Sequence, residues 1–171
     1  MEPTTVSNLD IYDHPPLEWS RAGDALPTSL PRMETPVFLG TASPDGRPHS
    51  AGVGAAYVDG ELYFTSGPGT RKSRNLAANP ACTLSIRLSD LDLVLEGDAH
   101  RVTDPATLKR LAAVYAGVGW PAESTGEAIT APFSAPSAGP GPWHLYHLTV
   151  KTAVGVATDE PHGATKWSFA E

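Results

Sequence analysis

The stretch from Thr65 to Leu76 combines residue types that together can bind an anion. Its order, Thr-Ser-Gly-Pro-Gly-Thr-Arg-Lys-Ser-Arg-Asn-Leu, predicts the end of a strand, a tight turn and the start of a helix. Three cations, Arg71, Lys72 and Arg74, fall in the first turn of that helix, where free N–H groups and the helix dipole favour negative charge. A bound phosphate removes this conflict, because the turn and the cations then surround it. The other reading that the residues allow is a solvated basic patch.

The rest of the chain is acidic, so this cluster is not the by-product of a basic protein. The 171 residues carry a formal net charge of −7, and 40% of them are hydrophobic. We therefore expect one domain with its own core. The charge argues against nucleic acid as a partner. No apolar run approaches the roughly 20 residues that a membrane span needs, so no membrane partner is expected.

Neither the N-terminus nor the cysteine content indicates secretion. Residues 1–5 lack a basic region followed by an apolar one, so we expect no secretory signal. The single cysteine, Cys82, excludes an internal disulfide, and no spacing typical of a zinc site occurs. We expect a cytoplasmic protein without a bound metal, with Cys82 as a buried strand residue.

The chain divides into an N-terminal arm, residues 1–32, and a folded domain, residues 33–171. Prolines argue against helices in the arm, although a short helix around Thr28 to Glu34 is compatible with the sequence. The apolar residues of the arm could dock on the domain or on a second subunit; they are Leu9, Ile11, Tyr12, Leu17 and Trp19.

Alternating apolar and polar residues predict a mainly β domain with six or seven antiparallel strands. Asp59-Gly60 is the strongest hairpin signal. Closure into a barrel would leave no open strand edges. The predicted strands are 37–42, 49–58, 61–66, 82–88, 91–96, 143–156 with a bend near Lys151-Thr152, and 165–169.

The second of these strands, residues 49–58, is rich in Gly and Ala and lacks bulk on both faces. Small residues in a strand often mark the close approach of a ligand or of another backbone. A barrel strand thinned for curvature explains the same composition, and both interpretations stay open.

Two helices and one long loop complete the prediction. The short helix runs from Arg71 to Ala78, with Thr70 as its cap and Asn79-Pro80 as its stop. A longer helix begins near Pro105 and ends at Gly117. Residues 117–142 form a long Gly- and Pro-rich loop, which we interpret as an ordered flap over a pocket.

No conventional catalytic pattern is present. The sequence contains no nucleophile elbow, no carboxylate pair suited to acid–base work and no metal-spaced histidine pair. His144 and His147 are interpreted as strand residues. His49 opens the glycine-rich strand, and a ligand contact and a plain surface histidine are equally compatible with that position.

One family shares this order of elements. The segment Asp45-Gly46-Arg47-Pro48-His49, the Asp-Gly hairpin, Thr-Arg-Lys-x-x-Asn-Leu-x-x-Asn-Pro from Thr70 to Pro80 and the hairpin that follows resemble the pyridoxamine 5′-phosphate oxidase-like proteins, also called flavin/deazaflavin split-barrel oxidoreductases. The similarity covers residues 33–102 and, more loosely, the closing strand with Lys166-Trp167. The arm and the 117–142 loop match no feature of the family.

The resemblance implies a split β-barrel homodimer with a cofactor, FMN or the deazaflavin F420, at the subunit interface. It implies that Arg71 and Lys72 hold the cofactor phosphate and that Trp167 closes the pocket. The remaining residues implied to bind cofactor are His49, Ser50, Ala51, Thr65, Ser66, Thr70 and Asn75.

The expected function is a hydride transfer between FMN or F420 and a small organic substrate, with the catalytic residues unknown. Pyridoxamine 5′-phosphate oxidation itself is not expected, because the Arg-x-His pattern near the C-terminus of the authentic oxidases is absent. The alternative is a non-catalytic barrel that stores or sequesters a flavin or a haem, with His49 or His162 as axial ligand. A structural or regulatory dimer with an empty site is a third reading.

Overall fold

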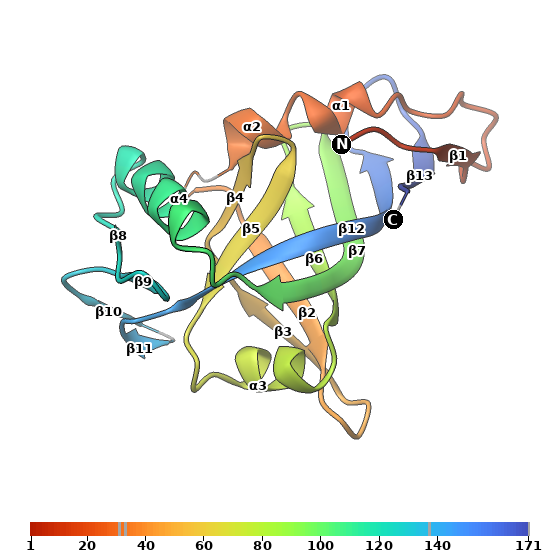
Figure 1. Cartoon of the computed structure of the whole chain (residues 1–171). Helices are drawn as coiled ribbons and strands as arrows, with labels where there is room; N and C mark the ends of the chain where they lie inside the picture. Colours follow the sequence, from red (N-terminus) through yellow and green to blue (C-terminus); the bar gives the residue numbers. More distant parts are fainter. Residues whose placement is uncertain (31, 33, 137, 171) are drawn as a thin grey trace.

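A computed structural model of the chain describes residues 1–30, 32, 34–136 and 138–170. Its centre is an antiparallel sheet that curls into a barrel, with helix α3 at one end and the N-terminal arm across the other (Figure 1). Among the described residues this sheet has nine strands, paired in the order β1-β13-β12-β7-β6-β2-β3, with β5 on β12 and β4 on β5. The mainly β architecture predicted from the sequence is confirmed.

The elements have the following bounds. The strands of the barrel are β2 (Val37–Ala42), β3 (Pro48–Gly52), β4 (Ala55–Val58), β5 (Glu61–Ser66), β6 (Ala81–Arg87), β7 (Leu91–Arg101), β12 (His144–Ala157) and β13 (Ala164–Ser168), and β1 (Thr5–Asn8) comes from the arm. The helices are α1 (Ser20–Gly23), α2 (Leu26–Ser29), α3 (Arg71–Ala78) and α4 (Pro105–Gly117).

The single strand predicted for residues 49–58 was wrong, because this segment changes partner halfway. β3 pairs with β2, whereas β4 pairs with β5. Between them the backbone N–H of Val53 still bonds to Val37, and the carbonyl of Gly54 accepts from Thr65. The segment therefore joins two edges of the curled sheet. Its small residues allow this turn close to both neighbouring backbones.

The predicted bend in the strand that begins near Trp143 is confirmed. The pairing of β12 with β7 shifts register between Val150 and Thr152, which marks a β-bulge. Gly97 lies opposite the bulge, and a Cβ placed on it would meet the carbonyl oxygen of Thr149. The bulge lets β12 pair with β5 over its first half and with β13 over its second half.

The core consists of two apolar clusters. The larger fills the barrel and includes Leu39, Phe64, Leu84 and Leu95, and the smaller lies under α4 around Leu111. Cys82 is buried at the edge of the larger cluster, and burial and nearby Asp98 raise its pKa to about 12.

The N-terminal arm packs on the barrel through one strand and two one-turn helices, and the second helix ends at Ser29, near the start of the interval suggested for a helix, Thr28 to Glu34. Strand β1 pairs with β13, and the helices α1 and α2 follow it. Pro27 lies in the first turn of α2, where proline is tolerated. Two residues inside this interval, Pro31 and Met33, lie outside the described residues.

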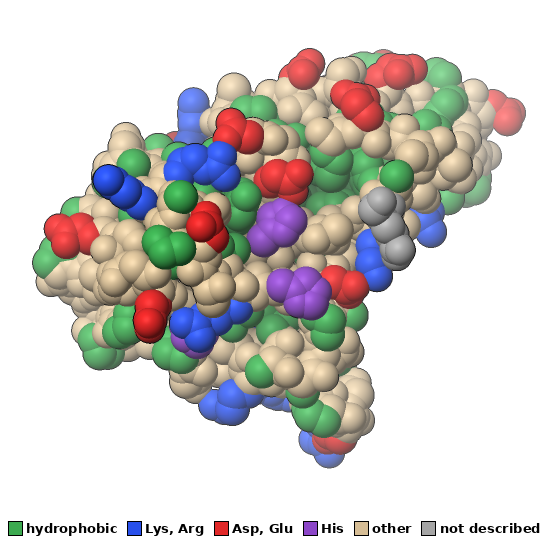
Figure 2. Space-filling view, viewed as in Figure 1, with side chains coloured by type: hydrophobic (Ala, Val, Ile, Leu, Met, Phe, Trp, Pro, Cys, Tyr) green, Lys and Arg blue, Asp and Glu red, His purple; other side chains and the backbone are tan. Residues whose placement is uncertain are grey.

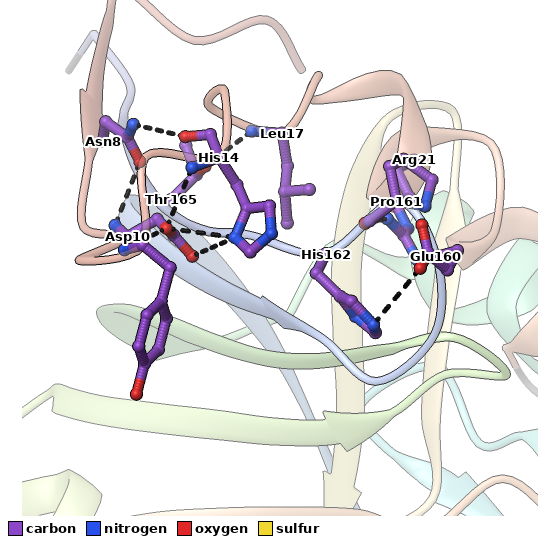
Figure 3. Close-up of polar contacts among 10 residues, drawn as sticks. Asn8, Asp10, His14, Leu17, Arg21, Glu160, Pro161, His162 and Thr165 are labelled. Carbon is purple, nitrogen blue, oxygen red and sulfur yellow. Dashed lines mark hydrogen bonds and ion pairs between the residues drawn. The ribbon is translucent and has the colours of Figure 1, made fainter.

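A polar network fixes the loop between β1 and α1 (Figure 3). The Asp10 carboxylate accepts hydrogen bonds from the backbone of Tyr12 and His14 and faces the His14 ring at 3.1 Å. The backbone N–H of Leu17 donates to the buried hydroxyl of Thr165 in β13 at 2.7 Å. The arm is therefore tied to the last strand of the barrel.

The Gly- and Pro-rich loop is ordered as two small hairpins beside α4 (Figure 1). The first pairs β8 (Glu123–Ser124) with β9 (Ile129–Thr130), and the second pairs β10 (Ser134–Ala135) with β11 (Gly139–Pro140). We call residues 120–143 the flap. None of the helices in the described parts of the chain is long and apolar enough to cross a membrane.

Candidate functional site

The predicted strand-turn-helix corner forms with the expected boundaries. Strand β5 ends at Ser66, and α3 begins at Arg71 after the Gly-Pro-Gly turn. Thr70 caps the helix: its hydroxyl oxygen accepts from the backbone N–H of Ser73 at 3.4 Å, and its O–H donates to the carbonyl of Gly67 at 2.8 Å.

The hydroxyl groups of this corner bond mainly to one another. The Ser66 oxygen lies 3.0 Å from the Thr70 hydroxyl and 2.7 Å from the Ser73 hydroxyl. Ser66 and Ser73 are buried. These hydroxyls therefore hold the turn in shape, and the groups left to contact a ligand are the cations.

The three cations of α3 have different environments. Arg74 donates from Nη1 to the carbonyl of Gly69 at 2.6 Å, so it braces the turn. Arg71 is exposed and Lys72 is only 5% exposed, and neither has a hydrogen bond or ion pair within the part of the chain that the structure describes. Burial lowers the pKa of Lys72. A mostly buried lysine whose ammonium has no partner among the described residues favours an anion at this site.

Both unpaired cations line one cavity of about 550 Å³, which we call the outer cavity. Facing them across it is strand β3, with His49 and Ala51. The volume lies within the range of about 300–1,000 Å³ that is usual for small-molecule pockets. The other described residues that line the outer cavity are Gly52, Gly69, Thr70 and Ala138.

A smaller chamber of about 100 Å³ lies beneath the flap, and we call it the flap chamber. It shares Gly52, Lys72 and Ala138 with the outer cavity, and Thr65 and Ser66 contribute to its wall. Two indoles from the flap complete the wall, Trp120 and Trp143, with ring centroids 5.5 Å apart. Described residues of the loop therefore line a pocket, as the interpretation of residues 117–142 as a flap requires.

His49 faces the cations with an unused ring nitrogen. Its Nδ1 is buried and has no hydrogen-bond partner among the described residues. Desolvation, and then the charges of Arg71 and Lys72, lower the pKa of His49. The lowered pKa favours the neutral imidazole near pH 7.

His49 also borders a wider hollow of about 930 Å³ on the face of β2, β3, β6, β7 and β12. Ser50 lines this hollow and not the outer cavity. Most residues around it are small, and Lys151 and Asp98 form an ion pair of 2.7 Å at its edge.

Two residues that the resemblance implied for the cofactor lie elsewhere in this chain. Asn75 is buried under α3 and bonds to Thr41. Trp167 has no exposed surface and packs edge-on against Trp19 in the core. The structure therefore does not bring either side chain to the outer cavity or the flap chamber.

None of the other histidines, all of which are described, lines the outer cavity, the flap chamber or the hollow beside His49. His147 bonds to Glu61 at 2.6 Å on the barrel surface. His162 lies beside the arm, 3.8 Å from the Glu160 carboxylate, as Figure 3 shows. No group of three or more metal-ligating side chains is found among the residues that the structure describes. His49 is the histidine that the fold brings to the cations.

The space-filling view agrees with this placement of charge. On the face that it shows, Lys and Arg side chains appear at the lower end, where α3 and the turn between β2 and β3 lie, and others appear at the upper left and on the right (Figure 2). In a chain of net charge −7, this end offers a local positive region to an anionic ligand.

Trp143 is the site residue that the sequence analysis did not identify. It appeared there only as the start of a strand, yet it is 2% exposed and its indole Nε1 has no partner among described residues. Its place at the site is visible only in the strand pairing of the folded chain. The next residue, His144, pairs with Ser66, so Trp143 lies beside the Gly-Pro-Gly turn.

Comparison with known proteins agrees with this fold. The sequence profile described as pyridoxamine 5′-phosphate oxidase matches residues 28–152. Among curated proteins, no sequence matches the chain.

Solved structures share the architecture at low identity. An F420 reductase is 23% identical, with a TM-score of 0.52, and the match covers 74% of this chain and 93% of that one. A pyridoxamine 5′-phosphate oxidase-related, FMN-binding protein from Nostoc punctiforme is 16% identical, with a TM-score of 0.55 and coverage of 91% and 98%. A NimC/NimA family protein from Clostridium acetobutylicum is 17% identical, with a TM-score of 0.58 and coverage of 88% and 91%.

Proposed function

Because the chain belongs to the pyridoxamine 5′-phosphate oxidase family, we propose that it is a flavin-type oxidoreductase that moves a hydride between FMN and a small organic substrate, with F420 as the alternative cofactor. The observation that carries the proposal is the pair of unpaired cations, Arg71 and Lys72, in the outer cavity. An F420 reductase and an FMN-binding protein that share this fold support it.

The residues present fit a flavin-type phosphate. Arg71 and Lys72 supply charge-assisted donors, and the His49 ring lines the same cavity. A bound flavin or deazaflavin supplies the hydride chemistry, and the protein supplies position and electrostatics. Strand β3 presents small side chains to the cavity, which lets a planar group approach its backbone.

The residues of the chain have separable tasks in this proposal. The ammonium of Lys72 and the guanidinium of Arg71 bind the phosphate, while Arg74 and Thr70 hold the turn that carries them. The flap covers the adjoining chamber and limits the entry of water. Neutral His49 can donate or accept a hydrogen bond at the cavity wall without adding positive charge.

The first experiment is an absorbance spectrum of the purified protein, followed by mass spectrometry of the released ligand. A flavin or deazaflavin spectrum supports the proposal and the mass separates FMN from F420, whereas a haem spectrum or no chromophore after reconstitution contradicts it. If the protein binds a flavin or deazaflavin whose spectrum does not change when candidate substrates are added, the non-catalytic alternative is favoured.

The double variant Arg71→Ala/Lys72→Ala should lose the cofactor and keep its fold, because it removes both free cations. The control is Lys109→Ala/Arg110→Ala, which removes two adjacent exposed cations from α4, one of which, Arg110, pairs with Asp59. Cofactor retention equal to that of the control would place the phosphate elsewhere.

We also propose a homodimer, in which a second copy covers the hollow beside His49 and Ser50 and so shares the cofactor site. Light scattering with size-exclusion chromatography should give twice the mass of the 18.0 kDa chain. The variant Ser85→Arg places a large cation in the hollow and should shift the mass toward the monomer. A wild-type protein that is monomeric with its cofactor bound would contradict the dimer.

A further inference from the structure

The loop that follows β1 presents an apolar cluster to solvent, and we call its residues, 9–13, the arm knob. Ile11 is 83% exposed, Tyr12 is 76% exposed, and Leu9 beside them is exposed as well. The loop is held in shape, because the Asp10 carboxylate accepts a hydrogen bond of 2.7 Å from the backbone N–H of Tyr12. An ordered apolar cluster that faces water is typical of an interaction surface.

The arm knob and the hollow beside His49 lie on the same outer face of the sheet. Thr152 in β12 lines the hollow, and Val156 of the same strand lines a cavity of about 410 Å³ together with residues of the arm knob. Side chains four residues apart on a strand point to the same face. A second copy that covers the hollow therefore lies next to the arm knob as well.

The two ends of this face carry opposite charge. One end holds the arm and the turn between β12 and β13, and the other holds α3 and the turn between β2 and β3, as Figure 1 shows. Lys166 offsets one charge at the first end, and Asp45 offsets one at the second. The exposed acidic residues of the arm end are Asp13, Asp159 and Glu160, and the exposed basic residues of the α3 end are Arg47, Arg71 and Arg74.

This distribution of charge favours one way of pairing the face with a second copy of itself. In a two-fold dimer both copies use the same face, so either like ends meet or the arm end of each copy meets the α3 end of the other. The first arrangement sets acidic groups against acidic groups and the two projecting arms against each other (Figure 1). The second sets the acidic arm end against the basic α3 end, and complementary charges favour it.

We propose that the arm knob of each copy docks on the α3 end of the other copy, next to Arg47 and Arg71. The outer cavity lies at this end, so the cofactor site of each copy gains two apolar side chains, Ile11 and Tyr12, from the second copy. This inference rests on the proposed function, because it names the part of the second copy that completes the cofactor site.

The test is chemical cross-linking between two versions of the full chain. Chains with Ile11→Cys and with Asp45→Cys are produced together with different affinity tags, purified through both tags with their cofactor, and treated with a short bismaleimide. Both positions are exposed, whereas the native Cys82 is buried and does not compete for the reagent. The control pair combines Ile11→Cys with Lys109→Cys, an exposed position on α4.

The Ile11→Cys and Asp45→Cys pair should give a covalent product of twice the 18.0 kDa chain mass, in a yield at least about fivefold above that of the control pair. Equal yields, or preferential linking of two Ile11→Cys chains, would overturn the proposal. A dimer that forms without this cross-link removes the arm contact and leaves the homodimer in place. A monomer that still shows a flavin spectrum removes both and leaves the flavin proposal standing.

Two variants test the apolar and the charged part of the contact. Ile11→Ser/Tyr12→Ser should raise the Kd of the dimer about tenfold or more, because apolar area is no longer buried between the copies. Val118→Ser, at an exposed apolar position at the end of α4, is the control and should leave the Kd unchanged. Asp13→Asn keeps a residue type that tolerates the φ of 63° and should weaken the dimer about 2- to 5-fold at low salt. A Kd that neither arm variant changes would show that the arm knob lies outside the interface.

Discussion

The side-chain amide of Asn75 donates a hydrogen bond of 3.0 Å to the hydroxyl of Thr41, and both side chains are buried. The bond joins the middle of α3 to strand β2. Since α3 carries Arg71 and Lys72, this pair fixes how the cations sit relative to strand β3, which is the neighbour of β2. Asn75 therefore acts on the candidate site through the position of the helix.

Replacing Asn75 with Ala should lower the free energy of unfolding by about 1–3 kcal/mol, because it leaves the Thr41 hydroxyl buried without a partner. Chemical denaturation measures the change. The double variant Thr41→Val/Asn75→Leu removes both polar groups and should recover part of the loss. If Asn75→Ala loses the cofactor while its stability is unchanged, Asn75 contacts the cofactor and is not a support for α3.

Gly155 leaves space for the Trp167 ring in the core. A Cβ at this position would lie 2.7 Å from Cζ3 and 2.8 Å from Cη2 of that indole. Gly155→Ala should therefore lower the free energy of unfolding by about 1–3 kcal/mol through overpacking, as thermal or chemical denaturation would show.

The control for this variant is Gly117→Ala at the end of α4, where a Cβ would meet nothing within 4 Å. It should be neutral or stabilising by up to about 1 kcal/mol, because alanine favours the helix. The folded Gly155→Ala protein should retain as much cofactor as the wild type. A selective loss of cofactor would instead place Trp167 at the cofactor, as the family resemblance implies.

Local signals explain which parts of the fold could be predicted. The helix Arg71–Ala78 has the predicted bounds, because its cap, Thr70, and its stop, Asn79-Pro80, lie next to it in sequence. The change of partner between β3 and β4 could not be predicted in this way. It depends on β2 and β5, which meet the segment only in the folded barrel.

At the candidate site, too, some residues could be identified from local sequence and others only from the folded chain. Arg71 and Lys72 could be identified because their charge conflicts with their position in the helix. The burial of Trp167 also follows from the alternation of its strand, in which exposed Lys166 precedes it and Trp167 points into the core. The family resemblance suggested a role at the cofactor instead. Trp143 could not be assigned from its neighbours, because the flap chamber exists only where residues 120–143 close over β5.

His49 is the titratable group that reports most directly on the site. Desolvation, and then repulsion from Arg71 and Lys72, hold its pKa below the ordinary value of 6.5. The unfolded chain therefore binds a proton on His49 more readily than the folded chain does. Between the lowered pKa and 6.5, this group makes the free energy of unfolding rise with pH and fall as the pH decreases.

Removing the charge of Arg71 or neutralising it with an anion should raise the pKa of His49, because the repulsion decreases while the desolvation stays. An NMR titration of the histidine ring protons measures this pKa, with His49→Gln to assign the signal among six histidines. We expect Arg71→Ala, and separately inorganic phosphate added to the cofactor-free wild type, to move the pKa toward 6.5. Arg47→Ala is the control, because Arg47 is exposed and pairs with Asp45 at 3.2 Å. A pKa that responds equally to both substitutions, or to neither, would show that Arg71 does not face His49 in the way that the outer cavity requires.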